Sequence, residues 1–203
     1  MARKTKEDML RTREVILSSA LDLFYKNGFS RTTLDQIASK SNCTRGAIYW
    51  HFKNKIEIFI KLSEKFENII AERFANIVET ENNEINDLKK FCQEFISILE
   101  KNKDFRRFYN MVLRKTEWTD ELRYVEKILI ENDKHTQKFF ELKFQAIANR
   151  NNLLPAITPK LASVGLLSYF FGLISWWLID QNECSTQDMF KLVDIYIDSL
   201  IID

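Results

Sequence analysis

The sequence has few of the residues that form tight turns, with four glycines and two prolines in 203 residues. Turn-rich β folds need both residue types repeatedly, so their scarcity excludes a sandwich or barrel of many short strands. The hydrophobic fraction of 45% and the charged fraction of 29% are those of a globular protein with a sizeable core. The sequence therefore predicts an all-α fold of long helices joined by few connections.

Cysteine and histidine are equally scarce, which excludes several kinds of site. Cys43, Cys92 and Cys184 are odd in number and lack C-x-x-C spacing, so they favour a reducing cytoplasm over a disulfide framework or zinc site. Glu131 and His135 lie four residues apart but make only two metal ligands. The sequence has no Gly-rich phosphate loop, nucleophile elbow or paired-histidine motif. We therefore expect no metal, no cofactor and no enzymatic activity.

Charge is divided unevenly along the chain, although the net charge is only +1. Residues 1–55 hold 11 Lys and Arg against 5 Asp and Glu, a net of +6, and the remaining 19 basic and 24 acidic residues give −5. This division predicts an anionic partner for the N-terminal segment, the alternative being a chance fluctuation in surface charge. The charged start of the chain has no apolar core behind it, which is unlike a signal peptide and favours a cytoplasmic protein.

Three helices are predicted in the basic segment. Apolar residues at helical spacing predict a helix over 7–27, ended by an Asn-Gly pair in which glycine adopts a left-handed conformation. Thr33, with Gln36 three residues later, forms a capping-box pattern that begins a second helix. Asn42 suits a left-handed turn, and Thr44 is the expected N-cap of a third helix. Two short helices joined by a tight turn and preceded by a third predict a helix-turn-helix.

The third helix, expected over residues 44–52, has one face suited to packing and one suited to DNA. Ala47, Ile48 and Phe52 fall at helical spacing and are predicted to pack against the first two helices. The outer face is left with five residues whose groups suit a nucleic acid: Thr44, Arg45, Gly46, Tyr49 and His51.

Each of these outer residues has a chemical reason to contact DNA. The guanidinium of Arg45 can bond a guanine edge, and Gly46 permits close approach. The hydroxyl of Tyr49 and the imidazole of His51 suit phosphate oxygens. We also expect phosphate contacts from Thr33, Thr44 and Lys55, because they lie at helix N-termini. Packing of the Tyr-Trp-His cluster inside the protein is the alternative.

Three segments carry a resemblance to a known family. Thr-Leu-Asp-Gln-Ile-Ala at 33–38 and Thr-Arg-Gly-Ala-Ile-Tyr-Trp-His-Phe-Lys-Asn-Lys at 44–55 resemble the N-terminal domain of TetR-family transcriptional repressors. The opening Met-Ala-Arg-Lys-Thr-Lys resembles the AcrR/TtgR branch, which represses multidrug efflux operons. The turn departs from the usual Ala-Gly-Val, since it reads Ser-Asn-Cys. We expect a helix-turn-helix domain over 1–54 and a ligand-binding and dimerisation domain over 55–203.

The remainder of the chain is predicted to be helical and rich in aromatic residues, giving about nine helices in all. Twelve of the sixteen phenylalanines lie beyond residue 60, where they fill a core or line an apolar cavity. Amphipathic patterns place the further helices at 55–79, 85–101, 104–115, 119–150, 161–179 and 186–202.

The segment from Leu161 to Ile179 runs 19 residues without a charge, near the length of a membrane span. A transmembrane helix is one interpretation, against which the serines of this segment argue. The other is a helix buried on all sides, between a ligand core and a second subunit. Small residues at steps of three and four support close approach of another helix: Gly165, Ser168, Gly172 and Ser175.

The resemblance implies a homodimeric repressor that places residues 44–52 in the major groove of a palindromic double-stranded DNA operator. Dimerisation is expected through the last two helices, with no membrane partner. A small hydrophobic or cationic drug-like inducer would release the protein from an operator that controls a multidrug efflux operon. A TetR-type regulator of a metabolic or stress operon is the alternative, and a membrane-anchored helical protein a more remote one.

Position-by-position resemblance also suggests a ligand pocket. Its six residues are Glu67, Tyr109, Leu113, Leu167, Phe170 and Phe171. The carboxylate of Glu67 is either a solvated surface group or a pocket anion that attracts cationic drugs. Phe171 stands where a related pocket carries an acidic group, which implies a more apolar cavity in this chain.

Overall fold

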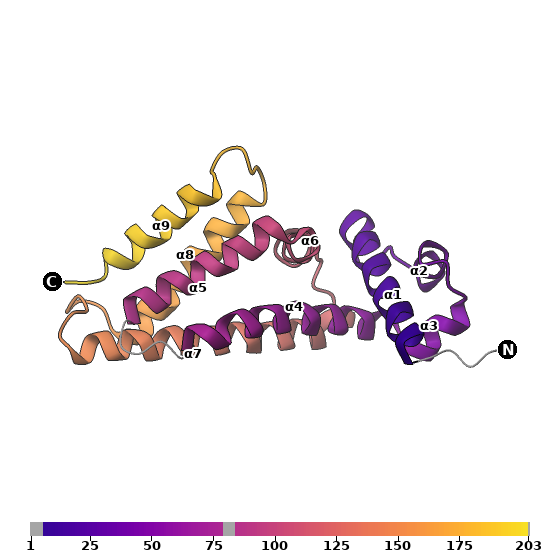
Figure 1. Cartoon of the computed structure of the whole chain (residues 1–203), viewed down its shortest axis with the longest axis horizontal. Helices are drawn as coiled ribbons and strands as arrows, with labels where there is room; N and C mark the ends of the chain where they lie inside the picture. Colours follow the sequence, from indigo (N-terminus) through magenta and orange to yellow (C-terminus); the bar gives the residue numbers. More distant parts are fainter. Residues whose placement is uncertain (1–5, 79–83, 203) are drawn as a thin grey trace. The chain divides into compact units, whose positions relative to one another are not determined.

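A computed structural model of the chain describes residues 6–78 and 84–202, which form nine α-helices and two short helical turns (Figure 1). The α-helices are α1 (Lys6–Asn27), α2 (Leu34–Lys40), α3 (Arg45–His51), α4 (Lys55–Val78), α5 (Glu84–Lys101), α6 (Lys103–Asn110), α7 (Arg123–Asn149), α8 (Pro159–Trp177) and α9 (Thr186–Asp198). A π-helical turn, η1 (Met111–Lys115), and a 3-10 turn, η2 (Asp120–Leu122), separate α6 from α7. The described ranges contain no strand, so the prediction of an all-α fold is confirmed.

Two predicted helices break where packing changes the backbone. The helix expected over 104–115 ends at Asn110 and continues as η1, and the one expected over 119–150 begins with η2. The helix expected to reach residue 202 ends at Asp198, because the last residues pair with the segment before α8. The amide of Leu154 donates to the carbonyl of Leu200 at 3.0 Å, and that of Ile202 donates to Asn152 at 2.9 Å.

Contacts divide the chain into two compact units, and each is described here by itself. The first unit comprises residues 1–67 and 103–126, and the second comprises 68–102 and 127–203. α4 and α7 each contribute residues to both units. These units are defined by packing and not by function. The expected boundary between a helix-turn-helix domain over 1–54 and a ligand-binding domain over 55–203 therefore stays a prediction.

The core of the first unit is a connected series of phenylalanine rings. The centroid of Phe59 in α4 lies 6.1 Å from Phe24 of α1, 5.7 Å from Phe29 and 6.1 Å from Phe108 of α6. Phe108 continues the series to Phe66, whose centroid is 4.8 Å away. Burying each ring is worth roughly 1.5–3 kcal/mol. These contacts make α6 part of the same core as the helices of the basic segment.

A mostly buried carboxylate adds polar ties between α1, α2 and α6. Asp22 lies 2.8 Å from the ammonium of Lys40, 3.1 Å from that of Lys26 and 3.6 Å from the guanidinium of Arg107. The hydrogen bond from Lys40 lowers the pKa of Asp22, and its partial burial opposes this change. The carboxylate therefore stays ionised near neutral pH and fixes α2 against α1.

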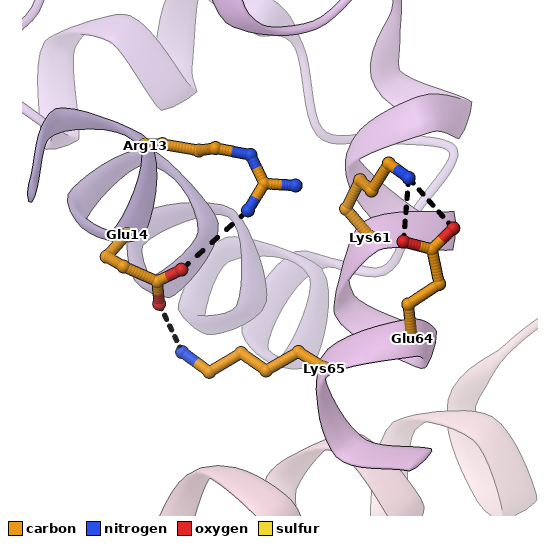
Figure 2. Close-up of polar contacts among 5 residues, drawn as sticks. All are labelled: Arg13, Glu14, Lys61, Glu64 and Lys65. Carbon is orange, nitrogen blue, oxygen red and sulfur yellow. Dashed lines mark hydrogen bonds and ion pairs between the residues drawn. The ribbon is translucent and has the colours of Figure 1, made fainter. Parts of the chain in front are cut away.

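Figure 2 shows further polar contacts between α1 and α4. Lys65 of α4 reaches Glu14 of α1 at 2.5 Å, and the guanidinium of Arg13 lies 3.8 Å from the same carboxylate. Lys61 pairs with Glu64 within α4 at 2.7 Å. Exposed pairs of this kind contribute about 0–1 kcal/mol each. They orient α4 on α1, and the buried rings supply most of the stability.

In the second unit, aromatic rings pack α5 against the end of α4 and against α7 and α8. The ring of Phe91 in α5 stacks on Phe74 at 3.9 Å and meets Phe140 of α7 edge-on at 5.0 Å. Phe95, one turn further along α5, lies 5.4 Å from Phe170 of α8. α5 is therefore the central helix of this unit.

Polar pairs fix the register of α5 in the second unit. The buried carboxylate of Asp87 accepts a hydrogen bond from Lys143 of α7 at 2.7 Å. Removing one partner of such a buried pair costs about 3–5 kcal/mol, because the other charge is left uncompensated. On the side facing α9, Lys89 lies 2.6 Å from Asp198.

α8 is buried on one side in the single chain, so its expected burial on the other side by a second subunit stays a prediction. Leu161 and Trp176 are 58% and 60% exposed, while a stripe through Leu166 and Phe170 is buried. Part of its small-residue face is covered by α9, since a Cβ added at Gly165 would lie 2.5 Å from a tyrosine hydroxyl of that helix. None of the helices in residues 6–78 and 84–202 is long and apolar enough to cross a membrane.

Candidate nucleic-acid interface

The connection between α2 and α3 has the geometry of a helix-turn-helix. Thr33 caps α2, because its hydroxyl accepts from the Gln36 amide at 3.2 Å while the Gln36 side chain accepts from the Thr33 amide at 2.9 Å. Asn42 adopts a left-handed conformation with φ of 51°, and Cys43 donates its amide to Ala38 at 3.0 Å. The predicted capping box and left-handed turn are confirmed.

α3 buries one face against the first unit. Thr44 is its N-cap and accepts from the amide of Ala47 at 3.1 Å. Ile48 and Phe52 are 0% and 1% exposed, as the spacing predicted. Ala47 is only half-buried, so it lies at the edge of this packed face. The cap and the two buried side chains fix which side of α3 faces outward.

The outward side of α3 carries a large aromatic surface. Thr44, Arg45 and Gly46 are exposed, and Tyr49 retains 49% of its accessible surface. Trp50 is 67% exposed, and the edge of its ring meets the half-buried imidazole of His51 at 4.9 Å. Sequence reasoning missed Trp50 as an outer residue. Its position four residues after Gly46 places it on the same face, so a complete assignment of helix faces would have found it.

Arg45 already has partners within the protein. Its guanidinium lies 3.4 Å from the Asp35 carboxylate of α2 and donates to the Tyr49 hydroxyl at 3.3 Å. The Tyr49 hydrogen bond and the Asp35 charge raise the pKa of Arg45, so the group stays charged. These contacts are long for hydrogen bonds, and they are exposed to solvent. A guanine edge or a phosphate can replace them without moving the backbone.

Nothing within the described protein requires glycine at position 46. A Cβ added there would meet only the Thr44 hydroxyl oxygen, at the ordinary distance of 3.8 Å. Gly28 differs, because its φ of 82° is one that side chains rarely adopt. Contacts among the described residues therefore do not explain glycine at position 46.

The hydroxyls of Thr33 and Thr44 keep a proton for an external acceptor. Each accepts one hydrogen bond from a backbone amide in its own helix cap. A hydroxyl that accepts still has its own O–H to donate. Both side chains are exposed, so each can donate to a phosphate oxygen.

Lys55 has a structural role that the sequence did not reveal. Its ammonium donates to the carbonyls of Phe29 and Ser30 at 2.9 and 3.5 Å and lies 4.2 Å from the Phe29 ring centroid. Burial lowers the pKa of Lys55, and the charge of Glu121 opposes this shift. The lysine thus ties the start of α4 to the connection between α1 and α2. Its phosphate contact stays a prediction.

The residues predicted to form a ligand pocket are divided between the two units. Glu67, Tyr109 and Leu113 belong to the first unit, where Leu113 is 37% exposed. Leu167, Phe170 and Phe171 belong to the second, where Phe170 is buried. The pocket therefore stays a prediction. A polar recess of about 360 Å³ in the first unit is lined by other residues, among them Arg31, Lys115 and Glu117.

Among the residues that the structure describes, no three metal-ligating side chains lie together. Glu131 instead pairs with Lys134 at 3.1 Å.

Comparison with known proteins decides the family. Residues 16–62 match the sequence profile of bacterial regulatory proteins of the tetR family. The HTH-type transcriptional regulator TtgR of Pseudomonas putida is 30% identical over 203 residues, which cover 98% of this chain and 96% of the relative. The chain belongs to the TetR family. This confirms the resemblance carried by residues 33–38 and 44–55.

This TetR-family protein is similar to other regulators over most of its length. The HTH-type transcriptional regulator AcrR of Shigella flexneri is 29% identical over 184 residues, covering 88% of this chain and 83% of the relative. The crystal structure of NalD, the secondary repressor of the MexAB-OprM multidrug efflux pump in Pseudomonas aeruginosa, matches with a TM-score of 0.83 and 28% identity, covering 97% and 98% of the two chains. These relatives are regulators, so the TetR-family protein is a transcriptional regulator and not an enzyme.

Proposed function

We propose that this TetR-family protein is a homodimeric repressor of a multidrug efflux operon, released from a palindromic operator by an apolar or cationic drug-like molecule. α3 enters the major groove, and a two-fold axis relates the two half-sites. The observation that carries the DNA contact is the exposed face of α3 with a glycine that the fold does not require. The +6 charge of residues 1–55 supports the same partner.

The proposed DNA contacts divide into base and backbone contacts. Arg45 exchanges the Asp35 carboxylate for a base edge and supplies sequence preference. Tyr49 and His51 contact the backbone beside it. Gly46 lets the helix approach the bases closely. Phosphate contacts from Thr33, Thr44 and Lys55 orient α3 but add no sequence information.

The last two helices support self-association. Large apolar side chains remain exposed on this part of the second unit, which is typical of a surface covered by another protein. They are Leu161, Val164, Trp176, Ile179, Leu192 and Ile195, each at least 38% exposed. A second copy of the chain presents the same apolar surface, so a two-fold contact covers both copies at once.

Efflux control is supported by the TtgR, AcrR and NalD similarities and by an aromatic-rich second unit. The proposed inducer pocket uses Glu67, Tyr109, Leu113, Leu167, Phe170 and Phe171. A regulator of a metabolic or stress operon would instead release DNA in response to a metabolite. Titration of the DNA complex with efflux substrates and with metabolites distinguishes the two hypotheses. Release by efflux substrates supports efflux control, and release by a metabolite supports control of a metabolic or stress operon.

The DNA contact is tested by a binding titration at fixed salt, using duplexes from the regions flanking the gene. Arg45→Ala should weaken specific binding by about 1–3 kcal/mol and relax base preference. Arg73→Ala is a matched control, because Arg73 is 61% exposed in the second unit and Arg45 is 59% exposed. Equal affinity of Arg45→Ala and the wild type would show that this arginine does not read the operator.

A further inference from the structure

Asp35 of α2 places a carboxylate beside the guanidinium of Arg45 at the start of α3. Both of its oxygens lie 3.4 Å from the same terminal nitrogen of Arg45. The other terminal nitrogen donates to the Tyr49 hydroxyl at 3.3 Å, and the guanidinium carbon lies 5.6 Å from the centre of the Tyr49 ring. The outer surface of the helix-turn-helix therefore carries hydrogen-bond donors and a charged acceptor side by side.

Both members of this ion pair are open to solvent. The side chain of Asp35 is 67% exposed, and that of Arg45 is 59% exposed. Within residues 6–78 and 84–202, Arg45 is the only residue that bonds the Asp35 side chain. An exposed pair of this kind contributes little to stability, so either group can turn to an external partner at small cost.

Asp35 also lies in the first turn of α2, where a carboxylate stabilises a helix. That role requires no neighbour on α3. The first amides of α2 already have the capping box that Thr33 and Gln36 form. Helix stabilisation therefore does not account for the position of the carboxylate against Arg45.

The sign of this charge is unfavourable on a surface that binds phosphates. Residues 1–55 carry a net charge of +6, and Asp35 stands two residues after Thr33, whose hydroxyl is proposed to donate to a phosphate. A carboxylate at this point repels the backbone of any DNA. Base edges, unlike phosphates, supply hydrogen-bond donors that compensate it.

The order of groups in the ion pair matches one base pair. The major-groove edge of a G·C pair presents two acceptors, guanine N7 and O6, followed by the amino donor of cytosine N4. The guanidinium of Arg45 supplies two donors, and the carboxylate of Asp35 beside it supplies an acceptor. An A·T pair presents acceptor, donor and acceptor, so it would place like groups against one another.

We infer that Asp35 is a specificity-determining residue, which accepts a hydrogen bond from the cytosine amino group of the base pair whose guanine Arg45 binds. The inference rests on the proposed function and names the base pair that this part of the surface selects. On the operator, Arg45 turns from Asp35 to the guanine, and the carboxylate gains the cytosine amino group in its place. On other DNA the carboxylate faces phosphates or acceptor edges and weakens binding.

Selection of bound duplexes from a random pool, at fixed salt, identifies the operator of the wild-type protein. The pair read by Arg45 is the one at which Arg45→Ala loses its preference for guanine. At this pair, 2-pyrimidinone in place of cytosine removes the amino group and keeps the guanine edge. Wild-type affinity should fall about tenfold on this duplex, whereas Asp35→Ala should bind the two duplexes about equally.

A duplex without the operator gives a second readout, which loss of structure would move in the opposite direction. Asp35→Ala should bind this duplex severalfold more tightly than the wild type, because a negative charge is removed from the surface that faces DNA. A misfolded variant would bind it less tightly. Weaker or unchanged binding of this duplex by a folded Asp35→Ala would show that the carboxylate does not face DNA.

Asp120→Ala is the matched control, because Asp120 is an exposed carboxylate of the same unit that also pairs with an arginine, Arg123. This variant should discriminate between cytosine and 2-pyrimidinone as the wild type does, and melting curves check that both variants fold. Discrimination that persists in Asp35→Ala overturns the inference. A wild type that binds both duplexes equally, or an operator at which Arg45→Ala loses no guanine preference, also overturns it.

Failure of the proposed function gives a different result. A pool that yields no common sequence for the wild type refutes operator binding, and the inference with it. A selected operator that shows no coupling between Asp35 and the cytosine refutes the inference alone.

Discussion

Replacing Gly46 with alanine should raise the stability of the protein and weaken its binding to DNA. The change adds one methyl group to the exposed side of α3, where the nearest atom of the protein is the Thr44 hydroxyl oxygen at 3.8 Å. No internal clash opposes it. Alanine in a helix is favoured over glycine by about 0.5–1 kcal/mol, because glycine loses more conformational freedom on folding. For a chain of this size, that gain raises Tm by about 1–4 °C.

The effect on binding has the opposite sign. If α3 approaches the bases closely at this point, the methyl group must displace a contact in a packed interface, which costs about 1–3 kcal/mol. Operator affinity should therefore fall about 5- to 150-fold. Thermal unfolding followed by circular dichroism measures the first effect, and fluorescence anisotropy with a labelled operator at fixed salt measures the second.

The two measurements test separate parts of the argument. Unchanged operator affinity would show that DNA does not approach α3 at Gly46. A lower Tm would show that the protein itself needs glycine there. If both Tm and operator affinity fell, misfolding of the variant would explain the loss of binding. We do not expect this result, because the added Cβ lies 3.8 Å from the Thr44 hydroxyl oxygen and meets no clash.

Three other substitutions test features of the two units. Lys55→Met should lower the free energy of unfolding by about 1–3 kcal/mol, because the hydrogen bonds from its ammonium to the carbonyls of Phe29 and Ser30 are lost; an unchanged denaturant midpoint would contradict this. If Lys55 also binds a phosphate, the same variant should weaken binding to all DNA sequences alike and flatten the salt dependence. Asp22→Asn should lower the free energy of unfolding at pH 7. Because the pKa of Asp22 is lower in the folded state than in the unfolded chain, where it is about 4, the ionised carboxylate stabilises the fold above that pH. This stabilisation disappears as the pH falls through the pKa of the folded state. Melting curves of both proteins should therefore converge in acid, and a constant difference would refute the ion-pair explanation. Ile195→Lys puts a charge on a side chain that is 65% exposed, so it should leave the fold intact and convert a dimer to a monomer in sedimentation equilibrium; a wild type that is already monomeric would exclude the symmetric operator complex.

Features that depend on neighbouring residues could be predicted from the sequence. The Thr33 and Gln36 capping box needs residues three apart, and the left-handed turn at Asn42 follows from one side chain. Helix periodicity likewise identified the buried positions Ile48 and Phe52. These structures follow from local rules, which is why the sequence alone predicts the helix-turn-helix.

Features that depend on distant residues could not be predicted. The Arg45 contact with Asp35 joins residues 10 apart, and the Lys55 contact with Phe29 joins residues 26 apart. Both depend on how helices pack, which periodicity does not specify. The π-helical turn η1 has the same origin, because its composition permits an ordinary helix and its backbone follows the packing of α6 on α1.

The participation of α6 in the first unit has a consequence for building hybrid regulators. A hybrid made by exchanging residues 1–54 alone would separate Asp22 from Arg107, and it would pack α1 against a foreign α6. A hybrid that also carries residues 103–126 keeps this ion pair and the Phe108 contacts, because both partners come from one parent. Operator specificity is therefore transferred more safely as two segments of the chain than as one.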